Sequence, residues 1–197
     1  MSAIRIGIII GSTRPGRNGA KVAEWVRDVA SAHAPDVEFA LVDLADYPLP
    51  HFDEPISPAR QASQHEQALA WASTIDGFDG FVFVTPEYNH SITGVLKNAI
   101  DYLYTEWTDK AAAIVSYGAA GGTRAAEHLR LILGELQIAD VRQQIGLSLY
   151  HDFEGFTELR PTDMQTAQVG AMVDQLVSWS GALRSVREAK AEAELAA

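Results

Sequence analysis

The chain has 197 residues, of which 47% are apolar and 21% are charged, as in ordinary globular proteins. This length suits one domain, which we expect to span residues 1–197. The 26 acidic residues outnumber the 15 basic ones, giving a net charge of −11. That excess argues against binding to nucleic acid or to an anionic membrane surface, because both partners need a basic face. The chain has no cysteine, which excludes disulfides, thiolate metal sites and cysteine nucleophiles.

The start of the chain lacks the basic stretch and apolar core of a secretory signal. No uninterrupted apolar run approaches the ~20 residues that a membrane-spanning helix needs. We therefore expect a cytoplasmic protein with no membrane partner.

The predicted elements alternate between strand and helix. Residues 4–10 form a β-branched run that is apolar on both faces, as a buried parallel strand requires. A helix follows Asn18, a residue type that suits an N-cap, and a long final helix follows Pro161, with a frayed end expected from Arg187. This alternation predicts an α/β fold with right-handed crossovers and a mostly parallel sheet. Further strands are expected at 37–44, 80–85, 111–117 and 141–149, and further helices at 58–75, 93–104 and about 125–136.

The loop at residues 11–19 is the first candidate site, because it joins a strand to a helix N-terminus. Its glycines let the backbone approach a ligand, and the helix start favours an anion. Ser12 and Thr13 can donate hydrogen bonds, and Arg14 and Arg17 can neutralise a phosphate. The loop matches neither of the common glycine-rich nucleotide motifs. The alternative is a tight turn with exposed arginines, but two arginines in an acidic protein favour phosphate.

Two more loops follow the third and fourth predicted strands. The segment 86–90 is charged and aromatic and can frame a planar heterocycle, or it is an ordinary loop with proline as punctuation. His90 within it is more simply a solvated side chain than an acid–base group. The segment 118–123 has three glycines in five residues, which either approach a ligand edge or only turn the chain.

The three loops together carry more weight than any one of them. They follow strands one, three and four, which are adjacent in a sheet of order 2-1-3-4-5, and ligands bind at that edge of such a sheet. A phosphate site, an aromatic frame and a glycine wall would converge there. That combination fits a phosphorylated flavin.

Four stretches of the sequence resemble the flavodoxin-like NAD(P)H-dependent FMN reductases, a group with azoreductase, quinone reductase and chromate reductase members. They are GSTRPGRNG at 11–19, DLADYPLPHFD at 43–53, TPEYNHSITGVLKNAIDYL at 85–103 and SYGAAGGTRAAEHLR at 116–130. They lie in order over residues 4 to about 150, and the third stretch is the most specific. The resemblance implies a three-layer sandwich around a five-stranded parallel sheet.

The resemblance also implies which residues hold FMN. The residues expected at the phosphate are Ser12, Arg14, Arg17, Asn18 and Gly19; those expected beside the isoalloxazine are Pro86, Glu87, Tyr88 and Asn89 on one side and Ser116, Gly118, Gly121 and Gly122 on the other.

By the same resemblance, NADPH or NADH reduces the bound FMN, and a quinone, azo compound or free flavin then takes the electrons in a ping-pong cycle. Since the flavin carries the redox chemistry, we assign no catalytic acid–base residue. Family members commonly form dimers or tetramers, so a homodimer or homotetramer is expected.

Three other functions are weaker. A flavodoxin-type electron carrier suits the acidic surface, but flavodoxin phosphate loops, by resemblance, are rich in Ser and Thr and lack the two arginines. A binding domain without FMN is disfavoured because all three loops are intact. No metal site is expected, because the six histidines show no metal-ligand spacing with carboxylates; they are His33, His51, His65, His90, His128 and His151.

Overall fold

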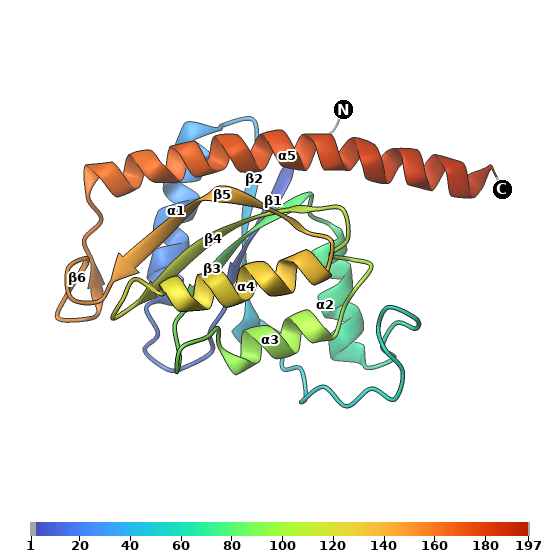
Figure 1. Cartoon of the computed structure of the whole chain (residues 1–197), viewed down its shortest axis with the longest axis horizontal. Helices are drawn as coiled ribbons and strands as arrows, with labels where there is room; N and C mark the ends of the chain where they lie inside the picture. The colour runs from blue at the N-terminus through green and yellow to red at the C-terminus, as the bar shows by residue number, and fades with distance from the viewer. Residues whose placement is uncertain (1–2, 197) are drawn as a thin grey trace.

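A computed structural model describes residues 3–196 and contains a five-stranded parallel sheet (Figure 1). The strand order is β2-β1-β3-β4-β5, and each neighbouring pair is parallel. The predicted sheet and its order are therefore confirmed. The strands are β1 (Arg5–Ile10), β2 (Glu38–Asp43), β3 (Gly80–Pro86), β4 (Ala111–Gly118) and β5 (Ala139–Ser148).

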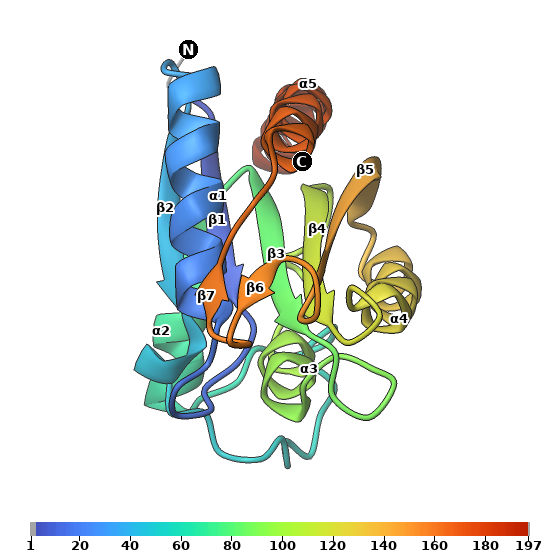
Figure 2. The ribbon, with the colours of Figure 1, turned by 90° about the vertical axis from the view of Figure 1, so that its left-hand side faces the viewer.

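Helices cover both faces of the sheet and make it the middle of three layers. In Figure 2, α1 and α5 lie on one side of the strands and α2, α3 and α4 on the other. Such double coverage explains why β3 and β4 are buried along their whole length. The helices are α1 (Gly19–His33), α2 (Glu66–Asp76), α3 (Gly94–Asp101), α4 (Thr123–Glu135) and α5 (Asp163–Leu195), with a 3-10 turn η1 (Leu44–Asp46) after β2.

Alternation along the strands divides the core into two halves. Ile8 and Val82 belong to the cluster under α1 and α5, whereas Ile9 and Phe83 belong to the cluster under α2, α3 and α4. All four side chains are fully buried. The sheet is therefore a rigid base, and its loops extend from the carboxyl ends of the strands. No helix within residues 3–196 is long and apolar enough to cross a membrane.

The second helix begins later than predicted. A helix was expected from Pro58, but α2 starts at Glu66. Residues 57–61 make only one turn, in which the N–H groups of Arg60 and Gln61 bond the carbonyl of Ser57. The Ser63 hydroxyl then accepts the His65 N–H at 3.2 Å, which interrupts a continuous helical ladder.

The last helix is longer than predicted. We expected fraying from Arg187, but α5 is helical to Leu195 and projects beyond the sheet (Figure 1). Asp79, which precedes β3, accepts hydrogen bonds from Arg184 Nε at 2.8 Å and from Arg187 Nη2 at 2.7 Å. Arg187 also donates to the carbonyl of Asp109 at 2.7 Å. These bonds hold the helix where fraying was expected to begin.

A short antiparallel hairpin between β5 and α5 was not predicted. Its strands are β6 (Phe153–Glu154) and β7 (Glu158–Leu159). Phe156 in the turn has a φ of +63°, an unusual conformation for a bulky residue. The sequence indicated only a loop here, because two-residue strands leave no pattern.

Candidate functional site

The loops that follow β1, β3 and β4 meet around one cavity of about 310 Å³. This is the convergence that the sequence predicted, at the carboxyl edge of adjacent parallel strands. We call it the loop cavity. It is lined by Arg14, Pro15, Gly16, Arg17, Asn18, Pro86, Glu87, Tyr88, Tyr117, Gly118, Leu149, Phe156 and Thr157.

The base of the loop cavity lies beneath the first turn of α1. Ser12 is fully buried there, and its hydroxyl has no hydrogen-bond partner. Gly19 does not line the cavity, but a Cβ at this position would lie 3.0 Å from the Tyr117 hydroxyl and 3.1 Å from Ser12 Oγ. Glycine therefore leaves the space that these two hydroxyls occupy.

The two arginines of the first loop differ in their surroundings. Arg17 donates to the carboxylate of Asp43 at the end of β2, and its side chain is largely buried. The exposed side chain of Arg14 makes no ion pair with any residue of the described range 3–196. Arg14 thus supplies the unneutralised positive charge, a distinction that the sequence did not reveal.

Asn18 stands at the N-cap of α1, as predicted, but its side chain does not cap the helix. Its Nδ2 donates instead to the carbonyl of Phe156 at 2.8 Å. Lys21 Nζ donates to the next carbonyl, that of Thr157, at 3.0 Å. Helix α1 thereby holds the hairpin turn against the cavity.

Glu87 fastens the second loop to the fourth helix. Its carboxylate accepts the backbone N–H of Arg124 at 3.0 Å and pairs with the Arg124 guanidinium. Burial opposes ionisation, but these hydrogen bonds outweigh it and hold the pKa of Glu87 below its usual value. A carboxylate bound in this way positions a loop and does not transfer protons.

The tip of that loop turns away from the cavity. Asn89 and His90 have φ angles of +49° and +76° and are exposed, whereas Tyr88 stays at the cavity rim. Asn89 was predicted beside the ring but is absent from the lining. His128 on α4 bonds the Ser91 hydroxyl at 2.9 Å and braces the turn from outside.

The glycine loop after β4 is shaped from beneath. Gly122 has a φ of +70°, and a Cβ there would lie 2.7 Å from the Tyr117 nitrogen, so only glycine fits. The buried Ser116 hydroxyl donates to the carbonyl of Gly121 at 2.8 Å. Of the four predicted residues in this region, only Gly118 lines the cavity. Ser116, Gly121 and Gly122 set the path of the wall.

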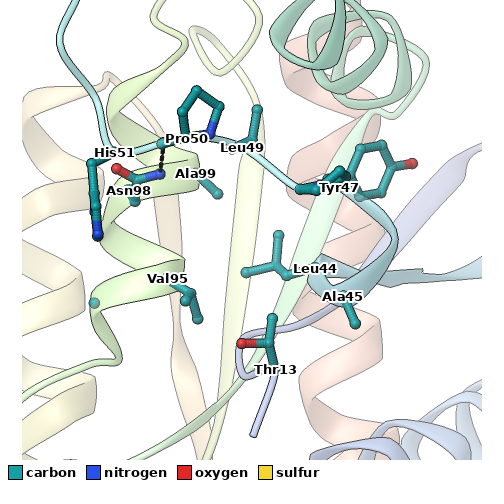
Figure 3. A pocket seen from close by; sticks show the side chains of 12 residues that line it. Thr13, Leu44, Ala45, Tyr47, Leu49, Pro50, His51, Val95, Asn98 and Ala99 are labelled. Carbon is teal, nitrogen blue, oxygen red and sulfur yellow. Dashed lines mark hydrogen bonds between the residues drawn. The ribbon is translucent and has the colours of Figure 1, made fainter.

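A second cavity of about 500 Å³ lies on the other side of the first loop (Figure 3). Thr13 lies at one end of it, and Leu44, Leu49 and Val95 form apolar walls. Asn98 on α3 fixes the segment opposite, since its Nδ2 donates to the carbonyl of Pro50 at 2.8 Å and its Oδ1 accepts the Phe52 N–H at 2.9 Å. Prolines at 48 and 50 keep this segment out of helix and strand.

Six residues that line the loop cavity were not among the predicted site residues. Two of them, Pro15 and Gly16, lie within the predicted first loop, and the other four lie outside all three loops. Tyr117 was overlooked because an aromatic residue at the end of a strand is usually core. The other three come from the segment after β5, which resembles no motif. They are Leu149, Phe156 and Thr157.

Comparison with known proteins agrees with this geometry. The model of the NADPH-dependent FMN reductase family matches residues 4–152. An NAD(P)H-dependent FMN reductase of Schizosaccharomyces pombe, C4B3.06c, is 39% identical over 150 residues, covering 75% of this chain and 74% of that protein. The NAD(P)H-dependent FMN reductase ntnL of Nectria sp is 41% identical over 138 residues, covering 66% and 69%.

Solved structures show the same fold. The flavoenzyme NAD(P)H:(acceptor) oxidoreductase FerB from Paracoccus denitrificans superposes with a TM-score of 0.71 and 25% identity, covering 91% of this chain and 98% of that one. The family match and the shared fold therefore lead to the same family. The chain belongs to the NADPH-dependent FMN reductase family and is an oxidoreductase that uses FMN with NADH or NADPH.

Proposed function

We propose that the chain binds FMN in the loop cavity, accepts a hydride from NADPH or NADH, and passes the electrons to a small-molecule acceptor in a ping-pong cycle. The observation that carries this proposal is the meeting of three loops around one cavity with unpartnered polar atoms at its base. FMN, when bound, supplies the two-electron redox chemistry. The chain's own residues bind, orient and enclose it.

The first loop provides the phosphate end. The α1 N-terminus and the unpaired Arg14 favour an anion, and the buried Ser12 hydroxyl has a free donor for it. Arg17 adds a second cation held in place by Asp43. We assign the phosphate to Ser12, Arg14, Arg17, Asn18 and Gly19, with Gly19 acting by leaving room.

The second and third loops provide the ring end. Pro86 and Tyr88 line the cavity on one side, and Gly118 lines it on the other. The Glu87–Arg124 pair joins these two walls, which supports a pre-formed slot for a planar group. We assign Pro86, Glu87, Tyr88 and Asn89 to one border and Ser116, Gly118, Gly121 and Gly122 to the other, several of them acting through the backbone.

No side chain of the loop cavity has the surroundings of a general acid or base. Glu87 is bound by Arg124, and the phenol of Tyr117 is held protonated by its burial. Hydride transfer to a flavin requires no proton donor at either place. The proposal therefore includes no catalytic acid–base residue.

The names of relatives support quinones as one acceptor class. A 2-hydroxy-1,4-benzoquinone reductase of Burkholderia sp is 33% identical over 148 residues. A quinone reductase of Pseudomonas putida is 29% identical over 193 residues, covering 92% of this chain. Azo compounds and free flavin remain in the proposal as competing acceptors. Cytoplasmic location and a homodimer or homotetramer also stay predictions, and light scattering of the purified protein tests the latter.

An anaerobic absorption spectrum of the FMN-loaded protein tests the proposed function. A slight excess of NADPH, or of NADH, should bleach the oxidised flavin band, and a quinone added next should restore it. Flavin that binds but stays oxidised with both nucleotides would favour the flavodoxin-type electron carrier. Failure to take up FMN would refute the assignment of the loop cavity.

A further inference from the structure

Three buried polar atoms without a hydrogen-bond partner gather at the base of the loop cavity. They are Ser12 Oγ, Arg17 Nε and the hydroxyl of Tyr117. Burying a donor without a partner is unfavourable, so native proteins hold few such atoms. Three of them at one place indicate a ligand that accepts several hydrogen bonds at once.

Tyr117 comes from a distant part of the sheet. It lies on β4, which β3 separates from β1 and its phosphate loop. Its ring extends under the first turn of α1, where both its hydroxyl and Ser12 Oγ border the space beside Gly19. The side chain is 5% exposed, yet it lines the loop cavity.

The phenol is a suitable donor to an anion. Burial raises the pKa of Tyr117 to about 12, and the nearby Ser12 hydroxyl and Arg17 charge only partly offset that rise. The hydroxyl is therefore neutral and protonated at physiological pH. A phosphate dianion offers acceptor oxygens for a phenol, a serine hydroxyl and a guanidinium together.

We propose that the Tyr117 hydroxyl donates a hydrogen bond to the phosphate of FMN, completing with Ser12 and Arg17 a donor set drawn from both β1 and β4. The inference rests on the proposed function and adds to it a phosphate ligand from a strand otherwise assigned to the ring end. It also explains why Gly19 has no side chain, since a Cβ would crowd the two hydroxyls.

Another tyrosine shows that an unpartnered phenol alone does not make a site. The Tyr102 hydroxyl is also buried without a partner, and the residue is 1% exposed. Tyr102 packs edge-to-face with Phe52 and belongs to the core on the opposite face of the sheet. Tyr102 does not line the loop cavity, and its hydroxyl is not among the polar atoms at the base of that cavity. Tyr102→Phe is therefore a matched control, because it removes the same atom from a similar burial.

Flavin titrations by fluorescence quenching, with FMN and with riboflavin, test the proposal. Riboflavin lacks the phosphate and reports on the ring end only. Tyr117→Phe should weaken FMN binding about 10-fold or more, as expected for a lost hydrogen bond to a charged group, and riboflavin binding less than 2-fold. Tyr102→Phe should leave both constants unchanged. The melting temperature of flavin-free Tyr117→Phe should equal or exceed that of the wild type, because no internal hydrogen bond is lost.

Other results of these titrations would contradict the role of Tyr117. Equal weakening of FMN and riboflavin, or a lower melting temperature of the flavin-free variant, would make Tyr117 a packing residue and overturn the proposal. A Tyr117→Phe protein that binds both FMN and riboflavin as tightly as the wild type does would also overturn it while leaving the proposed function intact. A wild-type protein without any preference for FMN would refute the phosphate site itself.

Discussion

Removing Arg17 should reduce FMN affinity because it leaves Asp43 as an uncompensated negative charge beside the site. Arg17→Ala deletes a cation of the phosphate loop and leaves Asp43, its ion-pair partner, unpaired beside the site. A unit charge about 5 Å from a phosphate, at an effective dielectric of about 20, contributes about 3 kcal/mol. In the wild type, Arg17 and Asp43 largely cancel each other, so the variant changes the local charge by one unit. We expect FMN binding about 100-fold weaker, at the full value of that single-charge effect.

A double variant identifies the cause. Arg17→Ala combined with Asp43→Asn also removes the unpaired carboxylate and should recover about 10-fold of the lost FMN affinity. Recovery is incomplete because the hydrogen bond from Arg17 to the FMN phosphate is still missing. The FMN dissociation constants of both variants are measured by fluorescence titration at one fixed ionic strength, with riboflavin as the control ligand that lacks a phosphate. Arg14→Ala serves as the comparison, since it removes an unpaired cation and strands no anion; its cost should be about 1.5 kcal/mol. The reasoning fails if the double variant binds FMN no more tightly than Arg17→Ala does.

Three further outcomes are expected. Asp79→Asn should destabilise the protein by about 2–4 kcal/mol in urea unfolding, because it removes the buried negative charge that pairs with Arg184 and Arg187. Burial opposes ionisation of Asp79, but its hydrogen bonds to arginine hold its pKa below the usual value. The stability that ionised Asp79 contributes is therefore complete above about pH 4 and is lost as the pH falls through the lower pKa of the folded state. Asp79→Asn should make the free energy of unfolding depend less on pH in this acidic range. Asn18→Ala removes the bond to the Phe156 turn and a residue assigned to the phosphate, with no loss of helix capping. FMN dissociation in stopped-flow displacement should be about 3- to 10-fold faster, the equivalent of one exposed hydrogen bond; an unchanged rate would show that neither contact retains FMN. His90→Ala should change turnover at saturating FMN less than about 3-fold, since a single exposed side chain outside the cavity supplies no proton, whereas general acid–base loss costs about 100-fold.

The strands and the converging loops were predictable because they depend on local patterns. Runs such as residues 80–85 are apolar on both faces only where helices cover both sides of a sheet, and strand order then brings the loops together. What the sequence could not provide was the pairing of side chains far apart in the chain. Arg14 and Arg17 cannot be distinguished from the sequence. The fold places Asp43, at the end of β2, beside Arg17, and so neutralises only that arginine. Asn18 is a residue type that often caps helices, yet its side-chain amide donates to the carbonyl of Phe156, 138 residues away.

Local signals also misled where two of them competed. Pro58 suits a first helical turn, but the hydroxyl of Ser63 offered the backbone another hydrogen bond and delayed α2. The charged tail after Arg187 has a composition typical of a fraying end, but the carboxylate of Asp79 and the carbonyl of Asp109 give Arg187 partners in another layer. In both cases, polar contacts that local propensity does not reveal shaped the helix end.

The hairpin of β6 and β7 contributes to the loop cavity from outside the range matched by the family model. The family match ends at residue 152, whereas Phe156 and Thr157 still line the cavity. Only Phe153 and Leu159 of the hairpin pack into the sheet core. The side chains of Asn18 and Lys21 hold the hairpin turn to the start of α1. Residues 154–158 therefore lie outside the sheet core, and two of them border the cavity. We expect substitutions in that segment to change the cavity mouth, and with it the rate at which ligands leave, without altering the sheet core.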